Sequence, residues 1–241
     1  MTSLKAEHLH AILPNAPAGD IEEELPYTHR VMREYQINTK LRYAAFIANV
    51  AKESGELYYV EEIADGGDYE WRQDLGNTQE GDGPRFKGHG YIQITGRNNH
   101  SVVGKALGVD AISDPEVLTR MPYAWLSAGY YWRYMSSWGD LNDYADDGDF
   151  EKTVLGVRGG PDPERRWYYD KAMEVLPDDL DAGEEEGGGG KVGADWPERT
   201  VKISPEGWLL DAETAAWLKV PSVANGEFAT DSEGWIYRKR M

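Results

Sequence analysis

Residues 40–53 read KLRYAAFIANVAKE, and this stretch decides the fold. Charged side chains stand at its two ends, whereas its middle is apolar on almost every side of a helix. A helix that is apolar all round is buried in the core of a domain, not laid on its surface. The stretch therefore predicts a buried central helix, and Gly55 is the residue that can end it.

Helical patterns flank this stretch on both sides. A short helix is predicted before Pro14, and a second over residues 20–35 with an interruption near Pro26. The best candidate for a strand is Tyr91–Thr95, which is short. Further helices are predicted over residues 97–107, 122–135, 149–156 and 163–176. The pattern indicates a mainly α fold.

The composition changes after the last predicted helix. Residues 178–195 are acidic and glycine-rich, which is typical of a flexible linker. Residues 196–241 contain strand-like runs separated by Gly and Pro: VKIS from 201, WLL from 208, FAT from 228 and WIY from 235. The tripeptide EGW occurs at 206–208 and again at 233–235. We expect a helical domain over 1–177, a linker over 178–195, and a small β-rich tail over 196–241 that is either a binding module or a structural appendage.

Charge and composition exclude several classes of function. The net charge is −18, and a nucleic-acid partner would need a basic face. There is no cysteine, hence no disulfide framework, and the five histidines lack zinc-ligand spacing. No apolar run approaches the ~18 residues of a membrane span. We therefore expect no metal or other cofactor, no nucleic-acid partner and no stable membrane association.

Acidic residues close the buried helix and follow it. Glu53 ends the apolar stretch, and a carboxylate there is costly unless it is paired or used. A turn at Gly55 would let Glu62 face Glu53 across a cleft, and Glu61 is adjacent. Two carboxylates in unequal environments are the standard means of glycoside hydrolysis, where one donates a proton and the other activates water. The spacing does not decide the matter alone, because 43 acidic residues give many accidental pairs.

A glycine-rich segment follows, and residues 81–100 read GDGPRFKGHGYIQITGRNNH. Its glycines permit tight turns and a close approach of the backbone to a ligand. Gln93, Thr95 and Asn98 supply neutral donors and acceptors of the kind that sugar hydroxyls need. The spacing is not that of a phosphate loop. The alternative is a purely structural glycine-rich turn.

Both segments resemble a known family. FIANVAKESGELYYVEE, from residue 46, is similar to the A-H-E-S-G-G-F…E-E stretch of family 19 glycoside hydrolases, particularly phage endolysins. Residues 81–99 resemble the family signature G-D-G-x-x-[YF]-[RK]-G-R-G-x-I-Q-[LI]-T-G-R-x-N. WGDLN from 138, DGDF from 147 and LGVRGG from 155 resemble later family motifs, in the family's order. The resemblance covers roughly residues 20–176.

The resemblance implies a lysozyme-like helical fold and inverting hydrolysis of a β-1,4-linked amino-sugar polymer. It implies that Glu53 is the general acid and Glu62 the base, with Glu61 as the alternative base. Thr95 falls where the family has a Ser or Thr that helps to hold the attacking water. The residues implied to line the sugar cleft or to support the acidic pair are Tyr91, Gln93, Asn98, and Arg165 or Arg166.

Three positions depart from the family pattern. Lys52 replaces the usual His before the acid, and a cation there would favour the ionised acid unless it is directed away. His89 replaces the Arg of G-R-G, so that a fixed cation becomes a titratable group. Arg158 replaces the Asn of N-G-G. We keep His89, Arg158 and Glu61 among the expected substrate-binding residues.

Three functions fit these observations. The first is a phage-type endolysin that cleaves peptidoglycan between N-acetylmuramic acid and N-acetylglucosamine. The second is a chitinase, and the third is an inactive wall-binding or virion protein. The first is favoured by the phage-like form of the motifs and by the lack of cysteines and of an apolar secretory signal. We expect a monomer that acts on peptidoglycan strands and reaches the wall from the host cytoplasm through a holin-type pore.

Overall fold

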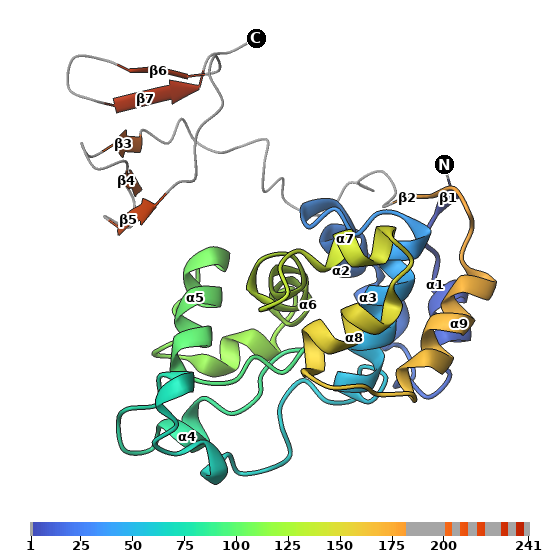
Figure 1. The fold of residues 1–241 in the computed structure, drawn as a ribbon, viewed down its shortest axis with the longest axis horizontal. Coiled ribbons are helices and arrows are strands. Elements are labelled where there is room, and N and C mark those ends of the chain that lie inside the picture. The colour runs from blue at the N-terminus through green and yellow to red at the C-terminus, as the bar shows by residue number, and fades with distance from the viewer. Residues whose placement is uncertain are drawn as a thin grey trace. The chain divides into compact units, whose positions relative to one another are not determined.

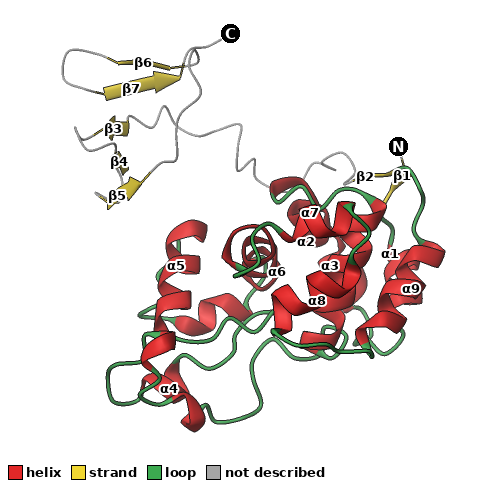
Figure 2. Cartoon of the chain, in the orientation of Figure 1, coloured by secondary structure: helices red, strands yellow, loops and turns green. Residues whose placement is uncertain are grey.

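The computed structural model describes residues 2–181 and, beyond them, the backbone of five strands between residues 201 and 238. The chain forms two compact units, Met1–Glu184 and Glu185–Met241. The described part of the first unit is built mainly from helices, and the second contributes strands (Figure 2). The mainly helical fold predicted from the sequence is therefore confirmed.

The helices of the first unit include all the predicted ones and two that were not predicted, Asp82–Arg85 and Leu141–Asp146 (Figure 1). They are α1 (Ala6–Ile12), α2 (Asp20–Glu34), α3 (Lys40–Ser54), α4 (Asp82–Arg85), α5 (Arg97–Leu107), α6 (Tyr123–Tyr130), α7 (Leu141–Asp146), α8 (Phe150–Arg158) and α9 (Arg165–Val175). Short 3-10 turns lie at Gly67–Tyr69, Gln73–Leu75 and Pro115–Thr119, and a π-helical turn at Tyr131–Met135 continues α6.

Helix α3 is the predicted central helix, and its side chains from Tyr43 to Ala51 are all buried. It begins at Thr39, whose hydroxyl accepts a hydrogen bond from the Arg42 N–H at 3.3 Å. It ends at Gly55, whose φ of 58° is left-handed and suits glycine. Helices α7, α8 and α9 pack against it, which places the carboxyl end of α3 beside the first turn of α9.

Helix α2 runs through Pro26, so the predicted interruption is wrong. A proline inside a helix removes the hydrogen bond to the carbonyl four residues earlier, here that of Glu22. Both Pro26 and Glu22 are exposed, so water can bind the freed carbonyl. The buried residues of α2, among them Ile21 and Val31, lie on the opposite side and keep the helix on the core.

The predicted strand Tyr91–Thr95 is also wrong, because these residues form a tight turn. Gly90 and Gln93 have φ values of 77° and 56°, which bend the chain back on itself. The two backbone hydrogen bonds between His89 and Ile94, at 3.1 and 2.8 Å, close the turn. The segment therefore pairs with itself and does not join a sheet.

The long loop 65–90 is folded by polar contacts. Asp82 is buried and accepts hydrogen bonds from the Thr78 and Gln79 N–H groups at 2.9 and 3.0 Å. Its carboxylate also forms an ion pair with Arg97, the first residue of α5. The loop is thereby fixed to the helix that follows the glycine-rich turn.

The described part of the first unit continues as far as Asp181. Strand β1 (Thr2–Ser3) pairs in parallel with β2 (Leu180–Asp181), so the start of the chain lies beside the end of the helical unit (Figure 1). Leu180 is buried, and Lys40 pairs with Asp178 at 2.7 Å. The first residues of the predicted linker thus belong to the helical unit, because they have an apolar and an ionic contact there. The rest of the predicted linker, 182–195, lies outside the described residues.

The second unit holds a five-stranded antiparallel sheet of order β5-β4-β3-β7-β6. Its strands are β3 (Val201–Ile203), β4 (Trp208–Asp211), β5 (Ala216–Lys219), β6 (Phe228–Thr230) and β7 (Trp235–Arg238). Four of these strands, β3, β4, β6 and β7, were predicted from the sequence, whereas β5 was not. Each EGW tripeptide ends where a strand begins, at Trp208 and at Trp235, but the side chains lie outside the described residues. The binding role of this unit stays a prediction.

Within the described chain, no helix is both long and apolar enough to span a bilayer.

Candidate active site

Glu53 is the last residue but one of α3, where the buried helix reaches the surface. Its side chain retains 22% of its exposure, so it is partly enclosed yet open to solvent on one side. One helical turn earlier, Asn49 lies on the same face of α3 and is fully buried. Helix geometry thus aligns a buried amide and a partly exposed carboxylate.

A buried arginine joins these two groups to α9. Arg165 is 2% exposed, and its Nη2 donates to Glu53 Oε1. Its Nη1 donates to Asn49 Oδ1 at 2.8 Å, and its Nε to Asp162 Oδ2 at 3.3 Å. The guanidinium fork therefore fixes the Glu53 carboxylate in one place relative to both helices. Of the two arginines left open by the sequence, Arg165 is the one that contacts Glu53.

Lys52 is directed away from this network. Its ammonium pairs with Glu164, one residue before α9. Successive residues on a helix point in different directions, which is why the cation beside Glu53 can be neutralised elsewhere. The departure from the family's His therefore leaves the contact between Glu53 and Arg165 intact.

Glu62 lies in the loop after α3 and is held by neutral donors. Tyr69 OH donates to its Oε1 at 3.0 Å, and Gly88 N–H to its Oε2 at 2.9 Å. In return the Glu62 N–H donates to the Gly88 carbonyl at 2.8 Å. Glu62 is thus tied to the glycine-rich turn, and its carboxylate is oriented without an ion pair.

Glu61 has the opposite environment. Its carboxylate forms a salt bridge with Lys87 at 2.8 Å and is 44% exposed. The hydrogen bond from Lys87 holds the pKa of Glu61 below its usual range. An exposed carboxylate that is bound to a lysine is a poor base, because the cation competes for its lone pairs.

We therefore expect different effects from replacing these two neighbours with glutamine. Glu62→Gln should lower kcat for glycan hydrolysis about a hundredfold or more, because it removes the expected base and keeps the shape of the side chain. Glu61→Gln should lower kcat less than about threefold, because it breaks only an exposed salt bridge. Initial rates on a soluble glycan at constant enzyme concentration measure both. The reverse order would assign the base to Glu61.

The glycine-rich turn presents Gln93 and Thr95, both half-buried. The Thr95 hydroxyl donates to the Gln93 carbonyl at 3.0 Å, and Gln93 Nε2 to the Gly90 carbonyl at 3.0 Å. Glu62 is hydrogen-bonded to Gly88, which belongs to the same glycine-rich segment as Thr95. This contact connects Glu62 to the segment that carries Thr95. Asn98, on the first turn of α5, is exposed.

No protein-family model matches the chain. An endochitinase from Arabidopsis thaliana is 32% identical over 122 residues, which is 50% of this chain and 40% of that protein. The chain thus spans well under two thirds of the curated relatives' length. Chitinase C from Streptomyces griseus has 21% identity and a TM-score of 0.55, covering 70% of this chain and 73% of that one. A family 19, class IV chitinase from Zea mays has 20% identity and a TM-score of 0.54, and the match covers 74% of this chain and 96% of that one.

The helical unit is therefore similar in fold to solved chitinases, one of them of family 19, and half of the chain is similar in sequence to a plant endochitinase. The resemblance drawn from the motifs is therefore confirmed at the level of the family. The finer resemblance to phage endolysins stays a prediction.

Two residues expected to line a sugar cleft of the helical unit are buried instead. Tyr91 is 1% exposed, and its hydroxyl donates to Glu24, which also accepts from Trp125 Nε1 at 2.8 Å. His89 is 2% exposed and bonds His100 at 2.9 Å. Neither side chain can contact a substrate in this structure. Both hold the glycine-rich turn against the core.

Two arginines of the expected set are exposed. Arg166 is 53% exposed and bonds Asp170 at 2.8 Å, which leaves it outside the network of Glu53. Arg158 is 52% exposed, donates to the Pro161 carbonyl at 2.7 Å and lies 3.8 Å from Asp162. Asp162 in turn bonds Arg165, so Arg158 is connected to Glu53 through two charged side chains.

Sequence reasoning missed three residues of the site. Asn49 and Asp162 complete the contacts of Arg165, and Tyr69 orients Glu62. Asn49 carried a usable signal, since it is a polar residue within an apolar helix, one turn before Glu53. Tyr69 carried none, because the loop brings it to Glu62 through tertiary contacts alone. Among the described residues, no cluster of His, Asp and Glu side chains could hold a metal ion.

The burial of His100 predicts that stability depends on pH. His100 is fully buried and bonds the Gly96 carbonyl through Nδ1 at 2.9 Å and His89 through Nε2. Burial lowers the pKa of His100 from 6.5 to about 4, so the folded chain keeps it neutral where the unfolded chain takes up a proton. We expect the free energy of unfolding to fall by about 3 kcal/mol from this residue as the pH drops from about 6.5 to about 4.

Urea unfolding of the wild type and of His100→Gln across this pH range measures that contribution. Carboxylates titrate in both proteins and contribute equally to both. The difference between the two plots of unfolding free energy against pH therefore gives the contribution of His100. The variant should show the flatter dependence. Curves that run parallel from pH 6.5 to pH 4 would contradict the assignment.

Proposed function

We propose that the helical unit hydrolyses β-1,4 bonds in polymers of N-acetylated amino sugars by an inverting, two-carboxylate mechanism. The observation that carries the proposal is the Glu53 carboxylate, which ends a buried helix and is bonded by the buried Arg165. Glu62 supplies a second carboxylate in a different environment, with hydrogen bonds from neutral donors only. Such a pair suits one acid and one base.

In this mechanism Glu53 gives its proton to the leaving glycosidic oxygen as the bond to the anomeric carbon breaks. Glu62 removes a proton from a water molecule, whose oxygen attacks the anomeric carbon from the opposite face. The half-buried Thr95 hydroxyl is suited to hold that water, because it belongs to the turn bonded to Glu62. Room for the water requires carboxyl groups ~6.5–9.5 Å apart.

Two polymers are candidate substrates. Chitin is supported by the curated relatives, which are endochitinases. Peptidoglycan, whose stem peptides bear carboxylates, is supported by Arg158, an exposed guanidinium connected to Glu53 through Asp162 and Arg165. Arginine recognises carboxylates in a bidentate way, whereas chitin offers it no anion. The endolysin activity expected from the sequence therefore remains a proposal.

Soluble chitin and purified peptidoglycan, digested side by side, test the proposal. We expect new reducing ends from at least one polymer. Proton NMR of the first products should show the α-anomer before mutarotation, because single displacement inverts a β-linkage. Products that first appear as the β-anomer would mean retention and a covalent intermediate. Release of no reducing ends from either polymer would overturn the proposed function.

A further inference from the structure

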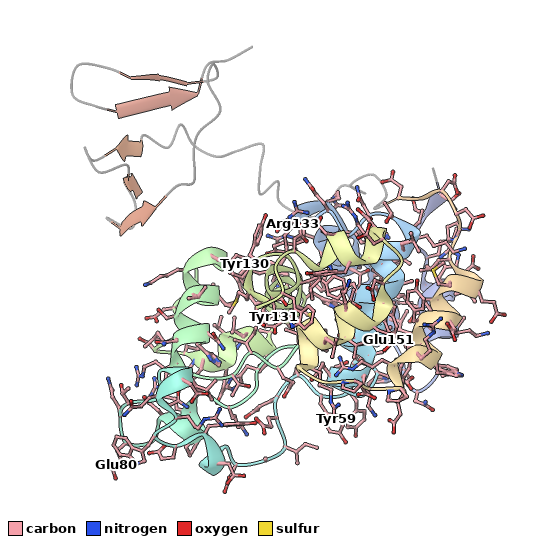
Figure 3. All side chains as sticks on the ribbon, in the orientation of Figure 1. Tyr59, Glu80, Tyr130, Tyr131, Arg133 and Glu151 are labelled. Carbon is pink, nitrogen blue, oxygen red and sulfur yellow. The ribbon has the colours of Figure 1, made fainter. Side chains whose placement is uncertain are left out.

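The turn that follows Glu53 has an unusual backbone. Gly55, Glu56 and Leu57 have φ values of 58°, 59° and 70°, three left-handed residues in succession. Only the first is glycine, and side chains disfavour this region. Such a conformation persists only where its surroundings hold it. Figure 3 marks this end of the unit with Tyr59, whose N–H donates to the Ser54 carbonyl at 2.8 Å.

The Glu56 side chain holds the turn. Its carboxylate is buried, with the residue 6% exposed. Oε2 accepts a hydrogen bond from Asn15 N–H at 2.6 Å, and Oε1 accepts from Asn15 Nδ2 at 2.8 Å and from Tyr168 OH at 2.9 Å. Asn15 lies in the connection between α1 and α2, and Tyr168 lies on α9. One carboxylate thus joins the turn to two separate segments.

Helix α9 contacts both carboxylates that flank the end of α3, those of Glu53 and Glu56. Arg165 bonds Glu53, and Tyr168, three residues further along α9, bonds Glu56. Residues three apart lie on one face of a helix. The two contacts therefore fix the end of α3 against α9 at two points, one of which is the general acid itself.

We propose that Glu56 is a positioning residue, which keeps the Glu53 carboxyl at its working place by locking the strained turn to α9 through Tyr168. The proposal rests on the proposed function, in which Glu53 is the acid. Glu56 acts through the backbone and α9, not by contact with substrate, since its side chain is buried. Its loss should therefore lower turnover more than substrate binding.

Two variants test this role. Tyr168→Phe deletes one donor and keeps the ring, and Glu56→Gln keeps the shape but sets an amide donor against the Asn15 donors. We expect kcat on a soluble β-1,4 N-acetylglucosamine oligosaccharide, or on solubilised peptidoglycan if only that is cleaved, to fall about tenfold for Tyr168→Phe and more for Glu56→Gln. KM should stay within about twofold of the wild type.

Asn142→Ala is the matched control for a merely structural loss. Asn142 is also buried, accepts from Trp132 Nε1 at 2.9 Å and donates to the Tyr35 carbonyl at 3.0 Å. This variant should lower the melting temperature yet leave kcat unchanged when assayed well below it. If Tyr168→Phe and Glu56→Gln behave in the same way, or raise KM alone, the positioning role is overturned. An active Glu53→Gln in the same set would instead overturn the proposed function.

Discussion

Replacing Glu53 with glutamine should reduce glycan hydrolysis by about a thousandfold while the helical unit stays folded. Glutamine fills the same space, and its Oε1 can still accept from Arg165 Nη2. What is lost is the proton that the leaving oxygen needs. Initial rates on chitin and on peptidoglycan, together with circular dichroism of the purified variant, measure both parts of the expectation.

Glu151→Gln is the control for this experiment. Glu151 lies on α8, is 60% exposed, and is labelled in Figure 3. The same chemical change there removes a carboxylate that has only a 3.8 Å contact with Arg166, and activity should not change. If Glu53→Gln keeps more than about a tenth of the wild-type rate, Glu53 is not the general acid.

The sequence predicted the helices best where packing and local pattern agree. Residues 40–53 were apolar around the whole helix, and α3 is indeed central. The predicted helix over 97–107 coincides with α5, which starts after Gly96 and stops before Gly108. Helix α7 was missed, because its six residues are too few to show a period and its start depends on one Asp140 cap.

The site was predicted less completely than the fold. Motifs drew attention to Glu53, Glu62 and Thr95, and the structure gives each a defined environment. Motifs do not report burial: the family resemblance places Tyr91 in the cleft, although its hydroxyl donates to the buried Glu24. Aromatic side chains with polar edges suit both a sugar and a core, and only tertiary packing separates the two cases.

The choice between Arg165 and Arg166 shows the same limit. The two are adjacent in sequence and identical in type, yet one is 2% and the other 53% exposed. A helix turns by about 100° per residue, so neighbours face different surroundings. Whether Arg165 or Arg166 faces α3 depends on how α9 packs against α3. No local sequence pattern encodes this packing.

This pair supplies the largest expected effect on stability. Arg165→Met should lower the free energy of unfolding by about 3–5 kcal/mol, because it leaves two partly buried carboxylates and a buried amide without their donor. Those groups are Glu53, Asp162 and Asn49. Arg166→Met, one residue along, should cost less than about 1 kcal/mol, because its ion pairs with Asp170 and Glu151 are exposed.

Urea unfolding of both variants at neutral pH measures the difference. The two proteins carry the same charge and the same new side chain, so net charge and helix propensity cancel in the comparison. Arg165→Met should also lower kcat, since the Glu53 carboxylate loses the contact that orients it. Arg165→Met could instead lower the free energy of unfolding no more than Arg166→Met does. That result would mean that the contacts of the buried guanidinium with its three partners only offset the free energy of its desolvation.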